Sequence, residues 1–145
     1  MESSIFDWKN YRDIFGGDVA SAKSEVVISS PGFGLRKVWK FIKEVAPLQE
    51  RGVRIAVLTL APSAYSDDAA GHQEELISAL RSVGIAVRCS ERCREHFAVI
   101  DNSIVWYGSM NLLSMEKEED SMMRLENTSI AQELLLKWVG MLPSD

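Results

Sequence analysis

Short runs of apolar residues alternate along the chain with longer segments whose apolar side chains recur every three or four positions. The short runs predict buried β-strands, and the longer spacing predicts helices with one apolar face. The predicted strands are residues 25–29, 53–60, 85–87, 97–100, 104–107 and 121–125. The predicted helices are residues 6–23, 35–50, 72–83 and 130–139.

Local signals define the connections between these elements. Gly16-Gly17 interrupts the first helical pattern, so residues 1–23 are expected to form a broken N-terminal helical segment. Residues 61–71 carry proline, glycine and several small polar residues, and we expect a mobile loop there. Residues 101–103 are turn-prone and lie between two apolar runs, which predicts a β-hairpin. The alternation predicts an α/β domain with a mixed sheet flanked by helices on both faces.

The composition is that of an ordinary globular domain. With 145 residues, 46% of them hydrophobic and 26% charged, residues 1–145 are expected to form one domain. The formal charge of −5 argues against a broadly basic surface that coats nucleic acid, but a local basic patch is compatible with it. Two cysteines indicate a reducing compartment. No apolar run approaches the ~18–20 residues of a membrane span, and no signal-peptide pattern opens the chain. We therefore expect a cytoplasmic protein with no membrane partner.

The most informative feature is a skeleton of fixed spacing, Arg94-x-His96-x4-Asp101-x6-Gly108-Ser109-x-Asn111. At every spacing this skeleton resembles the HxK(x)4D(x)6GSxN signature of the phospholipase D superfamily. Two residue types differ from that signature. Arg94 stands where the family places its nucleophilic histidine, and His96 stands where the family places its lysine.

The resemblance extends over nearly the whole chain. Further segments resemble, in the same order, the phospholipase-D-like domains that occur alone or appended to bacterial helicases and nucleases; these segments are residues 18–31, 52–55, 84–87, 119–125 and 130–135. The resemblance implies a single phospholipase-D-like domain. Because only one copy of the signature is present, it also implies a homodimer that places two motifs face to face. A helicase or nuclease partner, or a fused domain of that kind, is implied in the same way.

The resemblance assigns a chemical role to each motif position. In the family, one motif histidine attacks phosphorus, the partner histidine protonates the leaving oxygen, and lysines and asparagines hold the nonbridging oxygens. A guanidinium stays protonated at any working pH, so Arg94 can neither attack phosphorus nor act as a base. It can bind phosphate through a bidentate fork. We therefore expect a degenerate HKD motif, a pseudoenzyme site that binds phosphate through Arg94, His96, Ser109 and Asn111.

An active site built on the same residues is the first alternative. In that case the resemblance implies His96, Asp101 and Asp120 as catalytic residues, with Glu119 as a rival for Asp120. A two-residue slide of the strand would put His96 in the place of the nucleophile, but it would lose both the lysine and the aspartate positions. Each residue also has a purely structural interpretation, since Asp101 suits a turn cap and Asn111 suits the cap of a helix over residues 112–114.

The segment before the motif suggests two other sites. Cys89, Cys93 and His96 are three potential zinc ligands, but a complete structural zinc site takes four. We therefore expect no metal and no other cofactor. Arg88, Arg92 and Arg94 form a basic cluster that would attract phosphate, and the first two are equally compatible with ordinary loop charges.

The aromatic residues are expected to serve mainly the core. Trp39, Trp106 and Trp138 lie on apolar faces and are expected to be core or dimer contacts rather than base-stacking platforms. Phe33 is the exception, because it follows the first predicted strand, where ligands approach open α/β sheets.

The favoured function is a non-hydrolytic module that binds phosphate or nucleic acid, or dimerises, within a larger DNA-processing system. The partners expected on this hypothesis are a second copy of the chain, DNA or RNA, and a helicase or nuclease. One alternative is a phosphodiesterase or nuclease with residual activity through His96. The other is a purely structural dimerisation domain.

Overall fold

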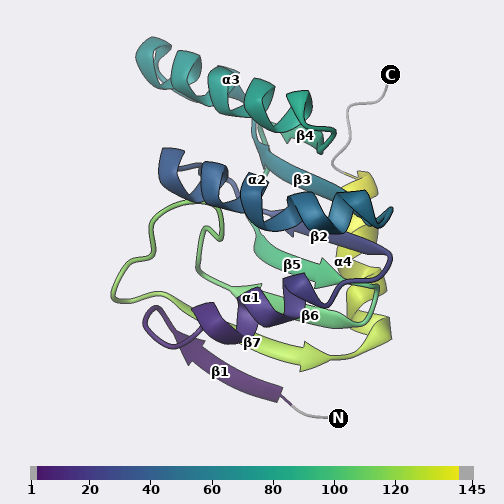
Figure 1. The fold of residues 1–145 in the computed structure, drawn as a ribbon. Coiled ribbons are helices and arrows are strands. Elements are labelled where there is room, and N and C mark those ends of the chain that lie inside the picture. The colour runs from purple at the N-terminus through teal and green to yellow at the C-terminus, as the bar shows by residue number, and fades with distance from the viewer. Residues whose placement is uncertain (1–2, 141–145) are drawn as a thin grey trace.

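The computed structural model describes residues 3–140 as a mixed seven-stranded sheet with helices on both faces (Figure 1). The strands are β1 Ser3–Asp7, β2 Glu25–Ser29, β3 Arg54–Leu60, β4 Ala86–Ser90, β5 His96–Ile100, β6 Ile104–Gly108 and β7 Ser121–Glu126. The helices are α1 Arg12–Ala20, α2 Leu35–Glu50, α3 Asp67–Ser82 and α4 Thr128–Gly140, with a 3-10 turn, η1, at Pro62–Ala64. The predicted α/β class and the helices on both faces are confirmed.

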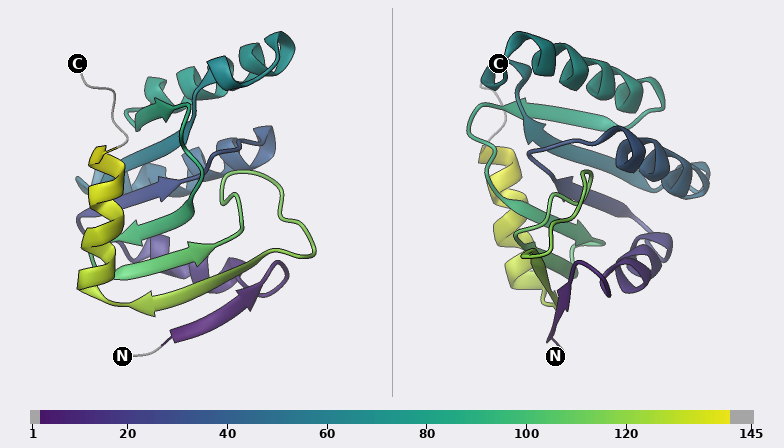
Figure 2. Two further views of the ribbon diagram at one scale, coloured as in Figure 1. Left: turned by 180° about the vertical axis from the view of Figure 1, so that it is seen from behind. Right: turned by 90° about the vertical axis from the view of Figure 1, so that its left-hand side faces the viewer.

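The strand order across the sheet is β1-β7-β6-β5-β2-β3-β4. Strands β2, β3 and β4 are parallel, and the pairings of β2 with β5, β5 with β6, β6 with β7 and β7 with β1 are antiparallel. Helices α1, α2 and α3 lie over one face, and α4 lies over the other (Figure 2). Helix α4 packs mainly on β5 and β6, and the two faces of the sheet are covered unequally.

Strand β5 shows why these residues form a doubly covered sheet. Ala98 and Ile100 are buried in the cluster beneath α1, α2 and α3, while Phe97 and Val99 are buried in the cluster beneath α4. Successive strand residues point to opposite faces, so a run of apolar residues indicates burial on both sides. The predicted hairpin of β5 and β6 is confirmed, with Asp101 and Asn102 of its turn both at positive φ.

The N-terminal segment differs from the prediction of a helix over residues 6–23. Residues 3–7 form the edge strand β1, which pairs antiparallel with β7, and the helix α1 begins only at Arg12. The side chain of Asp7 accepts hydrogen bonds from the backbone of residues 9 and 10 and so turns the chain between the two elements. The aromatic spacing is explained by packing, since Phe6 and Phe15 both contact the buried ring of Trp106. Residues 1 and 2 of the predicted segment lie outside the described residues.

The predicted loop over residues 61–71 is shorter than expected. Residues 62–64 form η1, and α3 already begins at Asp67. Asp67 and Asp68 occupy the first turn of α3, where carboxylates interact favourably with the helix dipole. Within residues 3–140 no helix is long and apolar enough to cross a bilayer.

The tryptophans divide between core and surface. Trp106 is fully buried, as predicted, whereas Trp39 on α2 is 47% exposed. The apolar side of α2 that packs on the sheet consists of Val38, Phe41, Ile42, Val45 and Leu48. Trp39 lies outside that set and faces away from the core. The side chain of Trp138 lies outside the described residues.

Candidate functional site

Most of the predicted site residues gather at one edge of the sheet. His96 is the first residue of β5 and pairs with Gly108, the last residue of β6. Ser109 and Asp120 stand at the two ends of the loop that connects β6 to β7. Asn111 in that loop accepts a 2.9 Å hydrogen bond from the backbone N–H of Gly32, which follows β2. The structure therefore brings His96, Ser109, Asn111 and Asp120 to the same edge of the sheet, which we call the motif edge.

Ser109 and Asp120 close the base of this loop. Ser109 Oγ donates a hydrogen bond to Asp120 Oδ1 at 3.0 Å and accepts one from Ser121 N at 3.0 Å. The other carboxylate oxygen of Asp120 accepts from Lys117 N at 3.0 Å. These bonds give the loop a defined shape, but they also occupy the hydroxyl that a phosphate would meet.

His96 is half-buried, and its electrostatic environment favours the neutral imidazole. Burial lowers the pKa of His96 below its usual 6.5, because the charged form loses hydration. The negative charge of Asp120 and a hydrogen bond to the backbone of Gly108 act in the opposite direction but do not outweigh burial. A neutral imidazole presents one donor and one acceptor nitrogen at neutral pH.

The glycines of this edge allow close backbone approach. A side-chain carbon on Gly108 would lie 2.2 Å from the carbonyl oxygen of Ser121 and 2.9 Å from Cα of Met122. Strand β7 therefore packs against β6 only if position 108 is glycine. A side-chain carbon on Gly32 would lie 3.3 Å from Asn111 Nδ2. The predicted helix after Asn111 is absent, since residues 112–114 form a turn. The Asn111 side chain instead ties the connection after β2 to the β6–β7 loop, residues 109–120, which we call the motif loop.

Arg94 lies outside the strand that carries His96. Strand β5 begins at His96, and Arg94 belongs to the preceding connection. Its Nη1 donates hydrogen bonds to the carbonyl oxygens of Glu91 at 2.9 Å and Cys93 at 3.1 Å. Within the described residues Nε and Nη2 donate no hydrogen bond. The guanidinium is thus tied to its own loop through Nη1, and the edge formed by Nε and Nη2 has no hydrogen-bond partner within the described residues.

Asp101 lies at the opposite end of β5 from His96. Its Oδ1 accepts hydrogen bonds from the backbone N–H groups of Ser24 at 2.8 Å and Glu25 at 3.0 Å and from the Ser24 hydroxyl at 2.9 Å. Its Oδ2 accepts from Lys23 N at 2.9 Å. Burial tends to raise the pKa of Asp101, but these hydrogen bonds outweigh it and lower the pKa. Asp101 therefore fastens the start of β2 to the hairpin turn and does not join the other site residues.

A buried carboxylate that the sequence does not distinguish anchors the motif loop to the helices. Glu116 accepts hydrogen bonds from the hydroxyl of Tyr11 at 2.7 Å and from Nη2 of Arg12 at 2.6 Å, and it forms an ion pair with Lys37. Its side chain is 7% exposed. Burial tends to raise the pKa of Glu116, but the hydrogen bonds from Lys37, Tyr11 and Arg12 lower it to about 2.

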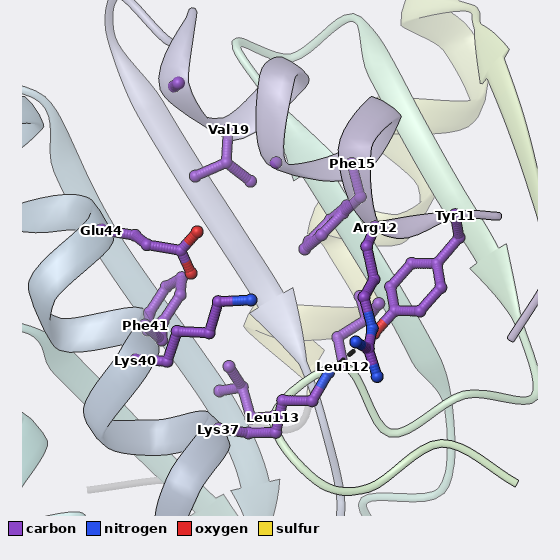
Figure 3. Close-up of a pocket in the computed structure, with 12 residues that line it drawn as sticks. Tyr11, Arg12, Phe15, Val19, Lys37, Lys40, Phe41, Glu44, Leu112 and Leu113 are labelled. Atoms are coloured by element: carbon purple, nitrogen blue, oxygen red, sulfur yellow. Dashed lines mark hydrogen bonds between the residues drawn. The ribbon is translucent and has the colours of Figure 1, made fainter. Parts of the chain in front are cut away.

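The partners of Glu116 form part of the wall of a pocket between α1 and α2 (Figure 3). This pocket has a volume of about 180 Å³ and a floor that includes Phe15, Phe41 and Leu113. The contacts of Glu116 are not visible in the sequence, because its partners are distant and Glu116 lies in a run of similar acidic residues, Glu116 to Asp120.

The potential zinc ligands do not form a metal-ligand cluster in residues 3–140. Cys93 is buried, with its sulfur 3.7 Å from the hydroxyl of Ser29, and Cys89 packs against the core beneath the helices. Among residues 3–140 no three histidine, cysteine or acidic side chains are grouped as metal ligands. The basic cluster is also divided, since Arg88 lies within β4 and Arg92 and Arg94 lie in the connection to β5.

Comparisons with known proteins agree with this geometry. The family model described as "Cardiolipin synthase, PLD-like domain" matches residues 18–137. Nuc from Salmonella typhimurium, a phospholipase D family member, has a similar structure with a TM-score of 0.72 at 17% identity, covering 97% of this chain and 94% of Nuc. NucT from Helicobacter pylori gives a TM-score of 0.74 at 16% identity, with the same coverage of 97% and 94%.

A third solved structure is similar over part of its length. TrmBL2, an archaeal chromatin protein, gives a TM-score of 0.66 at 11% identity, covering 97% of this chain and 51% of TrmBL2. No curated protein sequence matches the chain. At these identities the solved structures show a shared fold, and the family model covers most of the chain. The chain therefore belongs to the phospholipase-D-like family.

Proposed function

We propose that this protein is a phospholipase-D-like module that binds the phosphates of nucleic acid without hydrolysing them. The observation that carries the proposal is the pair of residues at the start of the motif. Arg94 replaces the nucleophile with a group that cannot lose its proton, and its free Nε and Nη2 edge suits a phosphate oxygen pair. Anchoring through Nη1 reduces the conformational freedom that binding would otherwise cost.

The number and position of the motif histidines support binding over cleavage. Hydrolysis by the family mechanism takes two imidazoles per site, one as nucleophile and one as proton donor. Each copy of this chain offers one histidine, His96, at the motif edge. In a homodimer the two His96 side chains would face each other, and both stand at the lysine position of the signature rather than at the nucleophile position. A neutral His96 can still donate a hydrogen bond to a phosphate oxygen.

Nucleic acid is the proposed source of the phosphate. Two proteins of similar fold are Nuc and NucT, and a third, TrmBL2, is a chromatin protein whose structure is described as showing a novel mode of DNA binding. Those properties belong to those proteins, and they support a DNA or RNA ligand here by likeness of fold alone. The single motif supports a homodimer, and the resemblance of the sequence to domains appended to bacterial helicases and nucleases supports a role within a larger DNA-processing assembly.

The binding experiment compares wild type with Arg94→Ala and with Arg51→Ala, an exposed arginine at the C-terminal end of α2. Fluorescence anisotropy of labelled DNA at about 50 mM salt should show binding, and the binding should weaken as salt rises. The reason is that Lys and Arg side chains that bind phosphates displace the counterions condensed on the DNA. Arg94→Ala should weaken binding and lower the salt slope by about 1, and Arg51→Ala should not. If wild type binds no DNA at low salt, the domain is a structural dimerisation module, and sedimentation then tests the dimer.

A residual phosphodiesterase through His96 is the second candidate. The lowered pKa of His96 favours it, because a neutral imidazole is the nucleophilic form. On this candidate, turnover of bis-p-nitrophenyl phosphate would disappear in His96→Ala and survive in Arg94→Ala. The preferred proposal predicts no turnover in any of these proteins.

A further inference from the structure

The outer face of α2 carries an unpaired basic strip beside an exposed tryptophan. Arg36, Lys40 and Lys43 are all exposed, and within the described residues none of them forms an ion pair or a side-chain hydrogen bond. Trp39 lies among them and is 47% exposed, and the neighbouring Leu35 is 53% exposed. These five residues line one shallow surface depression. We call Arg36, Trp39, Lys40 and Lys43 the α2 strip.

The α2 strip begins at the motif edge. The N–H of Gly34, the residue before α2, donates a 2.8 Å hydrogen bond to the carbonyl of Leu113 in the motif loop. Gly32, in the same connection, donates to Asn111. Arg36 is in the first turn of α2, so a ligand that leaves the motif edge along this helix meets Arg36 first. From Arg36 to Lys43 the helix rises about 10 Å.

We propose that the α2 strip binds single-stranded nucleic acid, with its three cations on successive phosphates and Trp39 stacked on an unpaired base. The inference rests on the proposed function, which it deepens by naming the strand class and a second set of contacts. Because phosphates are spaced by at least ~3.4 Å along a strand, up to about three phosphates lie within reach of a strip about 10 Å long. An exposed indole binds any base by its face, but only a base released from a duplex offers that face.

Charge and shape both favour this ligand. The strip places three exposed, unpaired positive charges along one face of a single helix in a chain whose net charge is −5, and this local charge attracts a polyanion. The acidic residue one turn along from Lys40 is Glu44, which lines the pocket between α1 and α2 and makes no ion pair with Lys40 (Figure 3). A membrane surface fits less well, because α2 already buries its apolar face against the sheet and only Leu35 and Trp39 remain to enter lipid.

The test uses two matched triple variants of the full chain. Arg36→Ala/Lys40→Ala/Lys43→Ala removes the strip cations, and Lys23→Ala/Arg51→Ala/Arg54→Ala removes three exposed cations from the opposite end of the sheet, so both carry the same net charge. Anisotropy is measured with a labelled single strand of about 12 nucleotides. The strip variant should bind at least about tenfold more weakly and lose about 2 from the salt slope, while the control variant stays near wild type.

The stacking contact is tested separately. Trp39→Ala should weaken single-strand binding about tenfold, and Trp39→Phe, which keeps an aromatic face, should lose much less. The affinity for duplex DNA of the same sequence should be unchanged by both substitutions. Equal losses in the two triple variants, or no effect of Trp39→Ala, would overturn the inference.

Other outcomes separate this inference from the proposed function. If Arg94→Ala and His96→Ala abolish DNA binding while the strip variants do not affect it, the motif binds phosphate and the strip does not. If only the strip variants lose binding, the strip inference stands and the motif proposal fails. Anionic phosphatidylglycerol vesicles serve as the membrane probe, and strip-dependent vesicle binding without single-strand binding would overturn the inference.

Discussion

Ser109 Oγ donates a hydrogen bond to Asp120 Oδ1 across 3.0 Å, which joins the two ends of the motif loop directly beside the start of β5. Through this bond the carboxylate of Asp120 is fixed in position, and its charge raises the pKa of His96 against the larger effect of burial. The motif loop therefore modulates the pKa of His96, while burial has the larger effect.

Asp120→Asn should lower the pKa of His96 further. The substitution removes the negative charge that favours the imidazolium and leaves the opposing effect of burial in place. NMR titration of the two histidines measures the change, with His96→Ala used to assign the signals. A His96 pKa that rises or stays fixed in Asp120→Asn would contradict this electrostatic relationship.

His96 should also make stability depend on pH. Its folded pKa lies below its unfolded value of about 6.5, so the unfolded chain binds more protons as pH falls past that value. The His96 contribution is complete above about pH 6.5 and is lost on acidification towards the folded pKa. Denaturant unfolding of wild type and His96→Gln between about pH 5 and about pH 8 should show a smaller slope for the variant.

Glu116→Gln should destabilise the protein by about 2 to 3 kcal/mol, because it removes the charge from a buried carboxylate that holds Tyr11, Arg12 and Lys37. Glu118→Gln, an exposed neighbour, is the control and should change stability by less than about 0.5 kcal/mol. Since the folded pKa of Glu116 is about 2 and its ordinary value is 4.5, the stabilisation is present above pH 4.5 and disappears as pH falls towards 2. Equal effects of the two substitutions would show that Glu116 is not an anchor.

Asp101→Asn should lower stability by about 1 to 2 kcal/mol and leave nucleic-acid affinity unchanged. The asparagine tolerates the positive φ at this position, but it brings an amide group towards the N–H donors of residues 23–25. Thermal unfolding and anisotropy measured on the same sample separate the two effects. Loss of binding without loss of stability would place Asp101 in the site after all.

The double substitution Arg94→His/His96→Lys should create measurable phosphodiester hydrolysis in a homodimer. It restores the residue types of the family signature on a fold that already supplies Ser109 and Asn111 at the same edge. Each single substitution serves as a control, and neither should gain activity alone. A double variant that folds and dimerises but stays inactive would show that the position of residue 94, outside β5, has also lost the site geometry.

The sequence predicts the hairpin well, because alternation and spacing act over neighbouring residues. His96, Ser109, Asn111 and Asp120 lie at one edge of the sheet, but Asp101 lies at the opposite end of β5. The sequence-based prediction fails where contacts between residues far apart in the chain determine the structure. Strand β1 pairs with the edge that β7 offers, whereas in the sequence the spacing of Phe6 from the following aromatic residues also suits a helix. Glu116 and Glu118 look alike in the sequence, yet only Glu116 has cationic partners, on α1 and α2. Trp39 fits the spacing of an apolar stripe, but α2 turns a different set of residues to the sheet.

The absence of hydrolysis is tested most directly by turnover assays with bis-p-nitrophenyl phosphate and with single- and double-stranded DNA, in which the wild-type protein is compared with Arg94→Ala and His96→Ala. We expect no turnover by any of the three proteins, together with DNA binding that Arg94→Ala weakens. Turnover by wild type that vanishes in His96→Ala and survives in Arg94→Ala would contradict it.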